Sequence, residues 1–231
     1  MRIRLVVYNV RGFRDDVPAL VRLVEHVRPD VLLLNESGAR WRLRRFSKAV
    51  AMRAAADPWS PLRRRVKNAV LVRAPWRIVE HRLQRFGGSA RWYPRGALLA
   101  GLEADGARFW AIAIHLGLHP MERRRHAEEL RSLTDALGGP VVIGGDLNER
   151  PDGGAVGVLA QGFRDAWLLA GDVDGETYPA REPGARIDYV FVSPEVSALQ
   201  VIVPPGPDAR SASDHLPVVA ELAIPDASAG P

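Results

Sequence analysis

Apolar residues along this chain form short continuous runs separated by polar turns. These runs have the length of strands, and several are apolar at every position, which is typical of strands covered on both faces. We therefore predict strands over residues 2–9, 31–35, 68–72, 76–82, 96–104, 108–116, 140–146, 186–192, 198–203 and 216–222.

Apolar residues at helical spacing alternate with charged residues in four other segments. They predict helices over residues 15–27, 39–55, 120–137 and 153–161. The first has apolar residues on one face and acidic residues in its opening turn, where they stabilise the amino-terminal end of a helix.

The order of these elements distinguishes between fold classes. Strands come in groups with helices interspersed, rather than in strict alternation, so two packed sheets with outer helices fit better than one doubly wound sheet. No linker, repeat or low-complexity tract divides the chain. We predict one domain over residues 1–224 and a flexible tail over 225–231.

The composition excludes several classes of function. The chain has 231 residues, 47% of them apolar and 26% charged, an ordinary balance for a globular protein. It has no cysteine, so disulfides, zinc-thiolate sites and cysteine nucleophiles are excluded. No apolar run approaches the roughly 18 residues of a membrane span, and the first ten residues predict a strand rather than a signal peptide. We expect a cytoplasmic protein without membrane insertion.

Charge is distributed unevenly along the chain. Residues 1–100 hold 22 Lys and Arg against 7 Asp and Glu, a net charge of +15, whereas residues 101–231 hold 10 against 20, a net charge of −10. Such asymmetry indicates a polyanionic partner. Solvated helix faces and stacked guanidinium groups are the alternative explanation.

Polar side chains suited to metal binding and acid–base chemistry end or follow many of the predicted strands. The stretch "GGDLNERPD" (144–152) follows the apolar run "PVVI", and comparable residues follow other strands. These residues are Asn9, Glu36, His115, Asp146, Asn148, Asp188, Asp214 and His215. If neighbouring strands bring their ends to one rim, a single cleft holds all of them.

This set of side chains fits the hydrolysis of phosphate esters. Carboxylate and amide oxygens are hard ligands suited to Mg²⁺ or Mn²⁺. Neutral Asn and His donate hydrogen bonds to phosphoryl oxygens, and a His–Asp pair supplies an oriented proton acceptor or donor. The chain has no Gly-x-Ser-x-Gly motif and no phosphate-binding or dinucleotide-binding glycine loop.

The motifs "YNVRG", "NES", "AIHLG", "GGDLNERPD", "ARIDYVFVS" and "SDHLPVV" occur in this order over most of the chain. In order and spacing they resemble the endonuclease/exonuclease/phosphatase superfamily. The resemblance implies an α+β fold, a four-layer αββα sandwich of two mainly antiparallel sheets. It also implies that Glu36 is the main ligand of a catalytic Mg²⁺ (or Mn²⁺), with Asn9 and Asp214 completing or neighbouring the metal site. One departure is Asn35, where the family more often has glutamine.

The same resemblance implies roles for the remaining residues. Asp146 matches the carboxylate that positions or activates the attacking water, and Asn148 and His115 match phosphate contacts. Asp188 is expected to orient His215, which acts as base or acid. Whether Asp146 or His215 takes the proton of the water stays open.

Three further residues are candidates for binding substrate: Asn68, Arg73 and Arg95. The sequence favours a Mg²⁺-dependent phosphodiesterase that acts as a monomer, most simply a nuclease on DNA or RNA, with the basic runs 40–45 and 63–67 holding the polyanion. The alternative is a phosphatase or phosphodiesterase for a lipid head group or a soluble phosphorylated metabolite. A binding protein with a degenerate site is a third possibility, which the complete set of polar residues disfavours.

Overall fold

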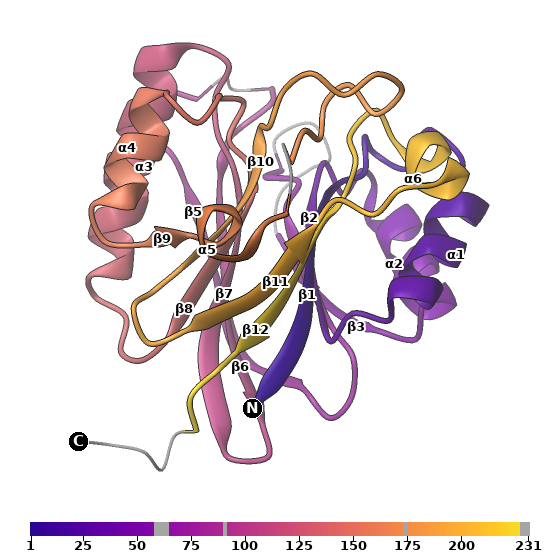
Figure 1. Ribbon diagram of the computed structural model, residues 1–231, viewed down its shortest axis with the longest axis horizontal. Coiled ribbons are helices and arrows are strands. Elements are labelled where there is room, and N and C mark those ends of the chain that lie inside the picture. Colours follow the sequence, from indigo (N-terminus) through magenta and orange to yellow (C-terminus); the bar gives the residue numbers. More distant parts are fainter. Residues whose placement is uncertain (58–64, 90–91, 173–174, 227–231) are drawn as a thin grey trace.

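Two six-stranded sheets pack face to face and carry helices on their outer sides (Figure 1). The structure is a computed structural model that describes residues 1–57, 65–89, 92–172 and 175–226. Within each sheet one strand pair is parallel, β1 with β2 and β7 with β8, and the other pairs are antiparallel. The predicted α+β four-layer sandwich of mainly antiparallel sheets is confirmed.

The strands of each sheet come from distant parts of the chain. The first sheet has the order β11 (Ser197–Ile202), β12 (Val218–Ala223), β1 (Arg2–Asn9), β2 (Val31–Asn35), β4 (Ala69–Val72) and β3 (Arg53–Ala56). The second has the order β5 (Arg77–Arg85), β6 (Gly96–Ala104), β7 (Ala107–His115), β8 (Val141–Asp146), β10 (Asp188–Val192) and β9 (Arg164–Asp165).

Helices form the two outer layers. Those on the first sheet are α1 (Val17–Val27), α2 (Arg40–Ala49) and α6 (Pro207–Ala212), and those on the second are α3 (Pro120–Thr134) and α4 (Gly154–Ala160) (Figure 1). The short helix α5 (Ala166–Ala170) follows β9. Asp16 caps α1 by accepting a hydrogen bond from the amide of Ala19, and His119 caps α3 through the amide of Met121.

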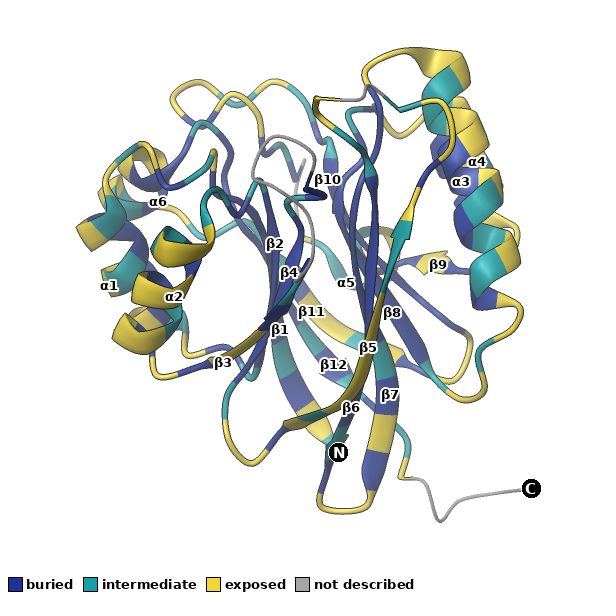
Figure 2. Cartoon of the chain, turned by 180° about the vertical axis from the view of Figure 1, so that it is seen from behind, coloured by how far each residue is buried: buried dark blue, intermediate teal, exposed yellow. Residues whose placement is uncertain are grey.

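Three apolar clusters fill the three interfaces between the four layers, and the central strands are buried on both faces, whereas β5 and β11 are largely exposed (Figure 2). In β1, Leu5 and Val7 belong to the cluster between the sheets, whereas Val6 and Tyr8 belong to the cluster beneath α1 and α2. Because both faces are covered, the strands read as continuous apolar runs in the sequence. This explains why most predicted strands agree with the observed ones to within two or three residues.

The predicted helix over 39–55 is wrong in its last third. Helix α2 ends at Ala49, and Ala51 has a positive φ of 51° that turns the chain back into strand β3. Alanine-rich residues 53–56 favour a helix locally, but here they pair with β4 at the edge of the sheet, where Ala55 packs between the sheets. Packing in the tertiary structure overrides local propensity. The sequence also did not predict β9, α5 and α6, which are too short for a periodic signal.

The two glycines of β8, Gly144 and Gly145, lie where neighbouring atoms leave no space for a side chain. A Cβ atom on Gly144 would lie 2.4 Å from Cγ2 of Val7 and 2.8 Å from Cδ1 of Leu33, so the opposite sheet leaves no space for a side chain. A Cβ on Gly145 would lie 1.8 Å from the carbonyl oxygen of Ile114. Glycine therefore lets the sheets approach closely just before Asp146.

No helix in the described ranges is long and apolar enough to cross a membrane. Residues 227–231 of the predicted tail lie outside the described residues, and Asp226, which precedes them, forms an isolated bridge with Ala107.

Candidate active site

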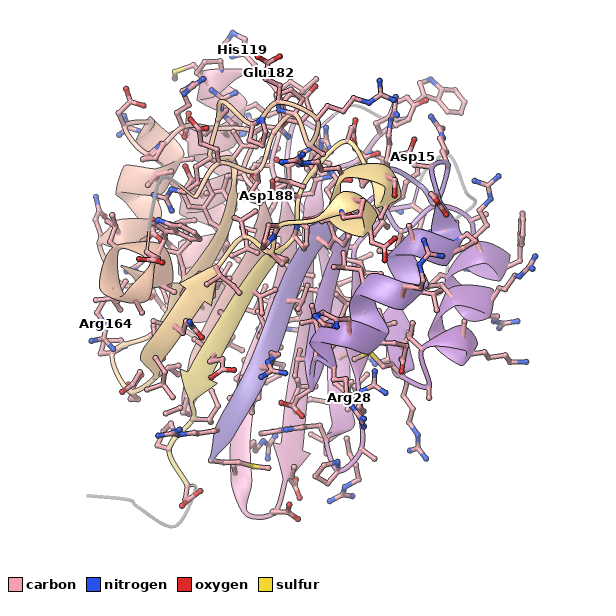
Figure 3. All side chains as sticks on the ribbon, turned by 45° about the vertical axis from the view of Figure 1, so that its right-hand side comes forward. Asp15, Arg28, His119, Arg164, Glu182 and Asp188 are labelled. Carbon is pink, nitrogen blue, oxygen red and sulfur yellow. The ribbon has the colours of Figure 1, made fainter. Side chains whose placement is uncertain are left out.

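Strand register brings the predicted site residues to one end of the sandwich. In the second sheet His115 pairs with Asp146, and Asp146 pairs with Asp188, so the three lie in one row across β7, β8 and β10. In the first sheet Asn9 pairs with Asn35 at the ends of β1 and β2. Figure 3 shows Asp188 toward the end of the sandwich at which His119 and Glu182 lie, with Arg28 toward the opposite end.

Asp146 is the centre on which the other groups converge. Its Oδ2 accepts a hydrogen bond from Nδ2 of Asn9 (3.0 Å) and lies 3.3 Å from Nε2 of His115 and 3.8 Å from Nε2 of His215. Its Oδ1 accepts from the amide of Asn148 (2.8 Å), whose positive φ of 52° turns the chain back toward the carboxylate. One carboxylate thus links both sheets.

The pKa of Asp146 reflects these contacts. Burial alone would raise it, but the charge and hydrogen bond of His115, the charge of His215 and the amide of Asn148 together bring the pKa below its ordinary value. Asp146 is therefore ionised at neutral pH.

Asp188 and His215 form a buried pair, as the sequence predicts. Nδ1 of His215 donates to Oδ2 of Asp188 (2.8 Å), which also accepts from the hydroxyl of Thr177 (2.6 Å). The ring of Tyr178 lies 4.9 Å from the His215 ring. Burial lowers the pKa of His215, but the charge and hydrogen bond of Asp188, helped by Asp146 and Asp214, raise it to about 9. Asp188 therefore fixes the ring with Nε2 directed toward Asp146.

Glu36 lies apart from this hydrogen-bonded group. It follows β2 with a positive φ of 51°, is half-buried and lines a cavity of about 370 Å³ together with Asn68 and His115. Within the described ranges its carboxylate makes no hydrogen bond or ion pair. A half-buried carboxylate without a protein partner is available to a ligand.

Asp214 is half-buried, and its Oδ2 lies 3.2 Å from Nε of Arg11. Arg11 and Glu36 line one groove, which adjoins the cavity. Asn9, whose Oδ1 accepts from the amide of Arg11 (3.1 Å), completes the predicted metal set.

Three described residues form a second candidate metal site. One ligand atom each from Asp146, Asp188 and His215 lies within 4.8 Å of the others, so these residues could hold a metal ion. Hydrogen bonds already occupy most of their ligand atoms, and Oδ1 of Asp188 is the one buried oxygen among them without a partner. The chemistry of the donor set therefore fits a divalent metal at either place, and Glu36 is the more available carboxylate.

Two of the three predicted substrate-binding residues lie at the site. Arg95 lines the cavity, with Nη1 at 2.7 and 2.6 Å from Nδ1 and Nε2 of His115. Asn68 also lines it, but its Nδ2 donates to the carbonyls of Gly96 and Ala113, so it connects the two sheets.

Arg73 was predicted at the site, and the structure does not bring it there. Strand β4 is antiparallel to β2, so its last residue pairs with the first residue of β2, at the far end of the sheet. Arg73 instead donates to the carbonyl of Pro29 and to Glu25.

Several residues support the site without having been predicted. Oδ1 of Asn35 accepts from the amide of Asp146 (2.9 Å), and its Nδ2 donates to the carbonyl of Ile114 (2.6 Å), so the family departure at this position bridges the sheets. Thr177 lies in a loop without a sequence signal. Lys67 and Arg65 belong to the predicted basic run 63–67, of which residues 63 and 64 lie outside the described residues.

This arrangement places the chain in a known class. Residues 6–215 match the Endonuclease/Exonuclease/phosphatase family, so the chain belongs to it, and the predicted resemblance is confirmed. The family's description names nucleases and phosphatases, which are hydrolases of phosphate esters. None of the curated protein sequences is similar enough to the chain to count as a relative.

Solved structures show the same fold at low sequence identity. An endonuclease/exonuclease/phosphatase from Bacteroides vulgatus is 16% identical, with a TM-score of 0.85 over 97% of this chain and 100% of that one. A mannosyl-6-phosphatase from Bacteroides thetaiotaomicron is 18% identical, with a TM-score of 0.78 over 96% and 99%. TDP2 from D. rerio, complexed with single-strand DNA product, is also 18% identical, with a TM-score of 0.78 over 96% of this chain and 99% of that one. At this identity the similarities establish the fold, which both a sugar phosphatase and a DNA-bound protein share.

Proposed function

We propose that this protein is a metal-dependent phosphodiesterase whose substrate is nucleic acid, DNA or RNA. The observation that carries the proposal is the convergence of Asn9, His115, His215 and the Asn148 amide on the ionised carboxylate of Asp146. Phosphoryl transfer needs an oriented water and donors for the charge that develops on the phosphoryl oxygens. These residues provide both.

In the proposed reaction Oδ2 of Asp146 and Nε2 of His215 share one water. These two atoms are 3.8 Å apart, which is too far for a direct hydrogen bond, and a water beside them can contact both. The oxygen of the water bonds to phosphorus as the bond from phosphorus to the leaving oxygen breaks. The proton of the water passes to Asp146 or His215, and the leaving oxygen takes up a proton from solvent water. Asp188 keeps the His215 ring in position throughout.

Asn9 and His115 would donate hydrogen bonds to the phosphoryl oxygens of the substrate. Nδ2 of Asn9 and the ring of His115 face the same carboxylate oxygen, so a phosphate bound there lies within reach of both. A bound Mg²⁺ or Mn²⁺ would add neutralisation of charge on the phosphoryl and leaving oxygens. Glu36 would hold it, with Asp214 and Asn9 as the further candidate ligands.

Cationic side chains on both sides of Glu36 support a polyanionic substrate. Arg14 and Lys67 line both the 370 Å³ cavity and an adjoining groove of about 320 Å³. Arg11 and Arg42 also line this groove. Phosphates that flank the scissile phosphate of a nucleic acid would meet these charges. The proposal further includes a monomeric protein acting in the cytoplasm.

A second candidate function is hydrolysis of a small phosphorylated metabolite or lipid head group. It is favoured by the size of the 370 Å³ cavity, which is typical of small-molecule sites.

The test is an assay of the purified protein with Mg²⁺ and then with EDTA on duplex DNA, single strands, RNA and a panel of small phosphate esters. We expect Mg²⁺-dependent cleavage of polymer with a higher kcat/KM than of any small ester. Turnover of small esters alone would transfer the proposal to the second candidate, and no turnover of any substrate would reject both.

A further inference from the structure

Cationic side chains outnumber carboxylates among the residues that line the 370 Å³ cavity beside Asp146. Four cationic residues line it: Arg14, Arg65, Lys67 and Arg95. The carboxylates among its lining residues are those of Glu36 and Glu122. If Glu36 binds a metal, the excess of positive charge becomes larger still.

Burial makes this excess unfavourable in the free protein. Burial lowers the pKa of Lys67, and the charges of Arg14, Arg65 and Arg95 lower it further against the attraction of Glu36. Burial likewise lowers the pKa of Arg95. Cations held close together in a partly desolvated cavity repel each other strongly, so a bound anion would remove an electrostatic cost.

Arg65 contributes a charge that the surrounding protein leaves partly unmatched. The residue is 1% exposed, and its Nη2 donates to the carbonyl of Gly38. Its Nε and Nη1 are buried without a hydrogen-bond partner in the described part of the chain. Asp57 attracts it at longer range but lies 3.7 Å from Arg85. An unmatched buried guanidinium at the wall of a cavity indicates a site for an anion.

This charge begins directly beside the catalytic residues but is distinct from them. Nη1 of Arg95 lies 2.6 Å from Nε2 of His115, which in turn lies 3.3 Å from Asp146. The phosphate that is hydrolysed belongs at Asp146, so an anion among Lys67, Arg65 and Arg14 is a second one.

The mouth of the cavity suits the organic part of a phosphorylated molecule. The ring of Tyr93 is 65% exposed, and the ammonium group of Lys67 lies 4.8 Å from its centre. Leu118, 70% exposed, lines the same cavity. A sugar or base packed on these side chains would direct an attached phosphate toward Lys67.

We propose that the cavity lined by Arg14, Arg65, Lys67 and Arg95 binds a second phosphate group, carried on the same substrate molecule as the phosphate that is hydrolysed. This inference rests on the proposed function and adds the substrate class to it. The four cations exceed the two carboxylates of the lining by two charges, which a phosphomonoester with about two negative charges matches better than a phosphodiester with one. Such a group occurs at the phosphorylated end of a nucleic acid or on a small bisphosphate. An enzyme with such a pocket prefers chain ends or bisphosphates to the interior of a polymer.

The test compares substrates that differ by one phosphate group. One pair is a single-stranded pentanucleotide with and without a terminal phosphate, at the 5′ or the 3′ end. The other pair is a nucleoside 3′,5′-bisphosphate and the corresponding 5′-monophosphate. We expect the additional phosphate to raise kcat/KM at least about tenfold in one pair, the equivalent of one charge-assisted hydrogen bond. The pair that responds identifies the source of the phosphate.

Two lysines allow a matched control, because Lys67 lines the cavity and Lys48 is exposed in the last turn of α2. Lys67→Gln should bring the ratio of kcat/KM values toward one, and Arg14→Gln should reduce it, whereas Lys48→Gln should leave it unchanged. A ratio near one in the wild type, or a ratio that Lys67→Gln does not alter, would overturn the inference while the proposed function stands.

A binding measurement separates failure of the inference from failure of the proposed function. The His215→Ala variant, titrated in EDTA with the same substrate pairs by calorimetry, should bind the phosphorylated member more tightly, and Lys67→Gln in that background should abolish the difference. If no substrate is hydrolysed but this difference is found, the proposed function fails and the pocket remains. Equal binding of both members rejects the pocket.

Discussion

The two halves of the chain contribute different things to one site. Residues 1–100 carry a net charge of +15 and supply the cations of the cavity together with Asn9 and Glu36, whereas residues 101–231, with a net charge of −10, supply His115, Asp146, Asp188 and His215. The first half is cationic where it faces the site, and the second half presents a hydrogen-bonded network around two buried carboxylates. The difference indicates that substrate binding and bond cleavage are largely separable, so substitutions in each half should have different kinetic signatures.

The largest effect is expected from substitution of Glu36. This carboxylate comes from the first half of the chain, but we propose that it takes part in bond cleavage by holding the metal. Glu36→Gln should reduce Mg²⁺-dependent cleavage by at least about 10³-fold, since the metal supplies several kcal/mol of transition-state stabilisation. The same variant should bind Mn²⁺ more weakly in an electron paramagnetic resonance titration. Unchanged Mn²⁺ affinity would assign the metal instead to Asp146, Asp188 and His215.

Next in size is the network of the second half. His215→Ala should lower kcat by about 10²–10⁴-fold, the range of general acid–base catalysis. Asp188→Asn should lose much of the same activity, because Asp188 acts through the ring that it orients. The double variant should therefore be scarcely slower than His215→Ala alone. Losses that multiply in the double variant would show that the two residues act independently.

A smaller effect is expected from the cations of the first half. Binding of a single-stranded oligonucleotide to the Asp146→Asn variant should weaken with salt, with a slope of log affinity against log salt of about −0.7 for each phosphate neutralised. Arg14→Gln in that background should flatten the slope by about one such increment. Lys48→Gln should not change it. A slope that is already flat before substitution would contradict a polymer substrate.

The smallest effect concerns stability in the absence of metal. The pKa of His215 in the folded protein is about 9, above its ordinary value of 6.5, so folding is favoured when the ring is protonated. This contribution is complete below pH 6.5 and is lost as the pH rises to about 9. In EDTA, the difference in free energy of unfolding between wild type and His215→Gln should shrink over that interval. A difference that grows with pH would mean that the folded state keeps the ring neutral.

Much of the site was predictable because its residues lie at the ends of buried strands. The row from His115 through Asp146 to Asp188 follows from three apolar runs and their register. Arg73 shows the limit of this reasoning, since the antiparallel direction of β4 carries its last residue to the far end of the sheet. Direction within a sheet depends on pairing, which a run of apolar residues does not reveal.

Contacts between distant segments account for the rest. Thr177 hydrogen-bonds to Asp188 from a loop without a motif, and Asn35 joins Asp146 across the two sheets. The burial of Arg65 was equally hidden, because a basic run in the sequence suggests a solvated surface. Helix 39–55 failed for the related reason that alanines 54–56 have a helical propensity that pairing with β4 overrides.

The central claim is that the chemistry takes place at Asp146, and substitution of that one carboxylate tests it most directly. The kcat/KM for a phosphodiester in Mg²⁺ should be measured for wild type, for Asp146→Asn and for the control Asp152→Asn, an exposed carboxylate six residues further along the chain. Asp146→Asn keeps the shape of the side chain and removes its charge, so we predict a loss of at least about 10²-fold, with wild-type activity in Asp152→Asn. Wild-type kcat/KM in a folded Asp146→Asn variant would contradict the claim.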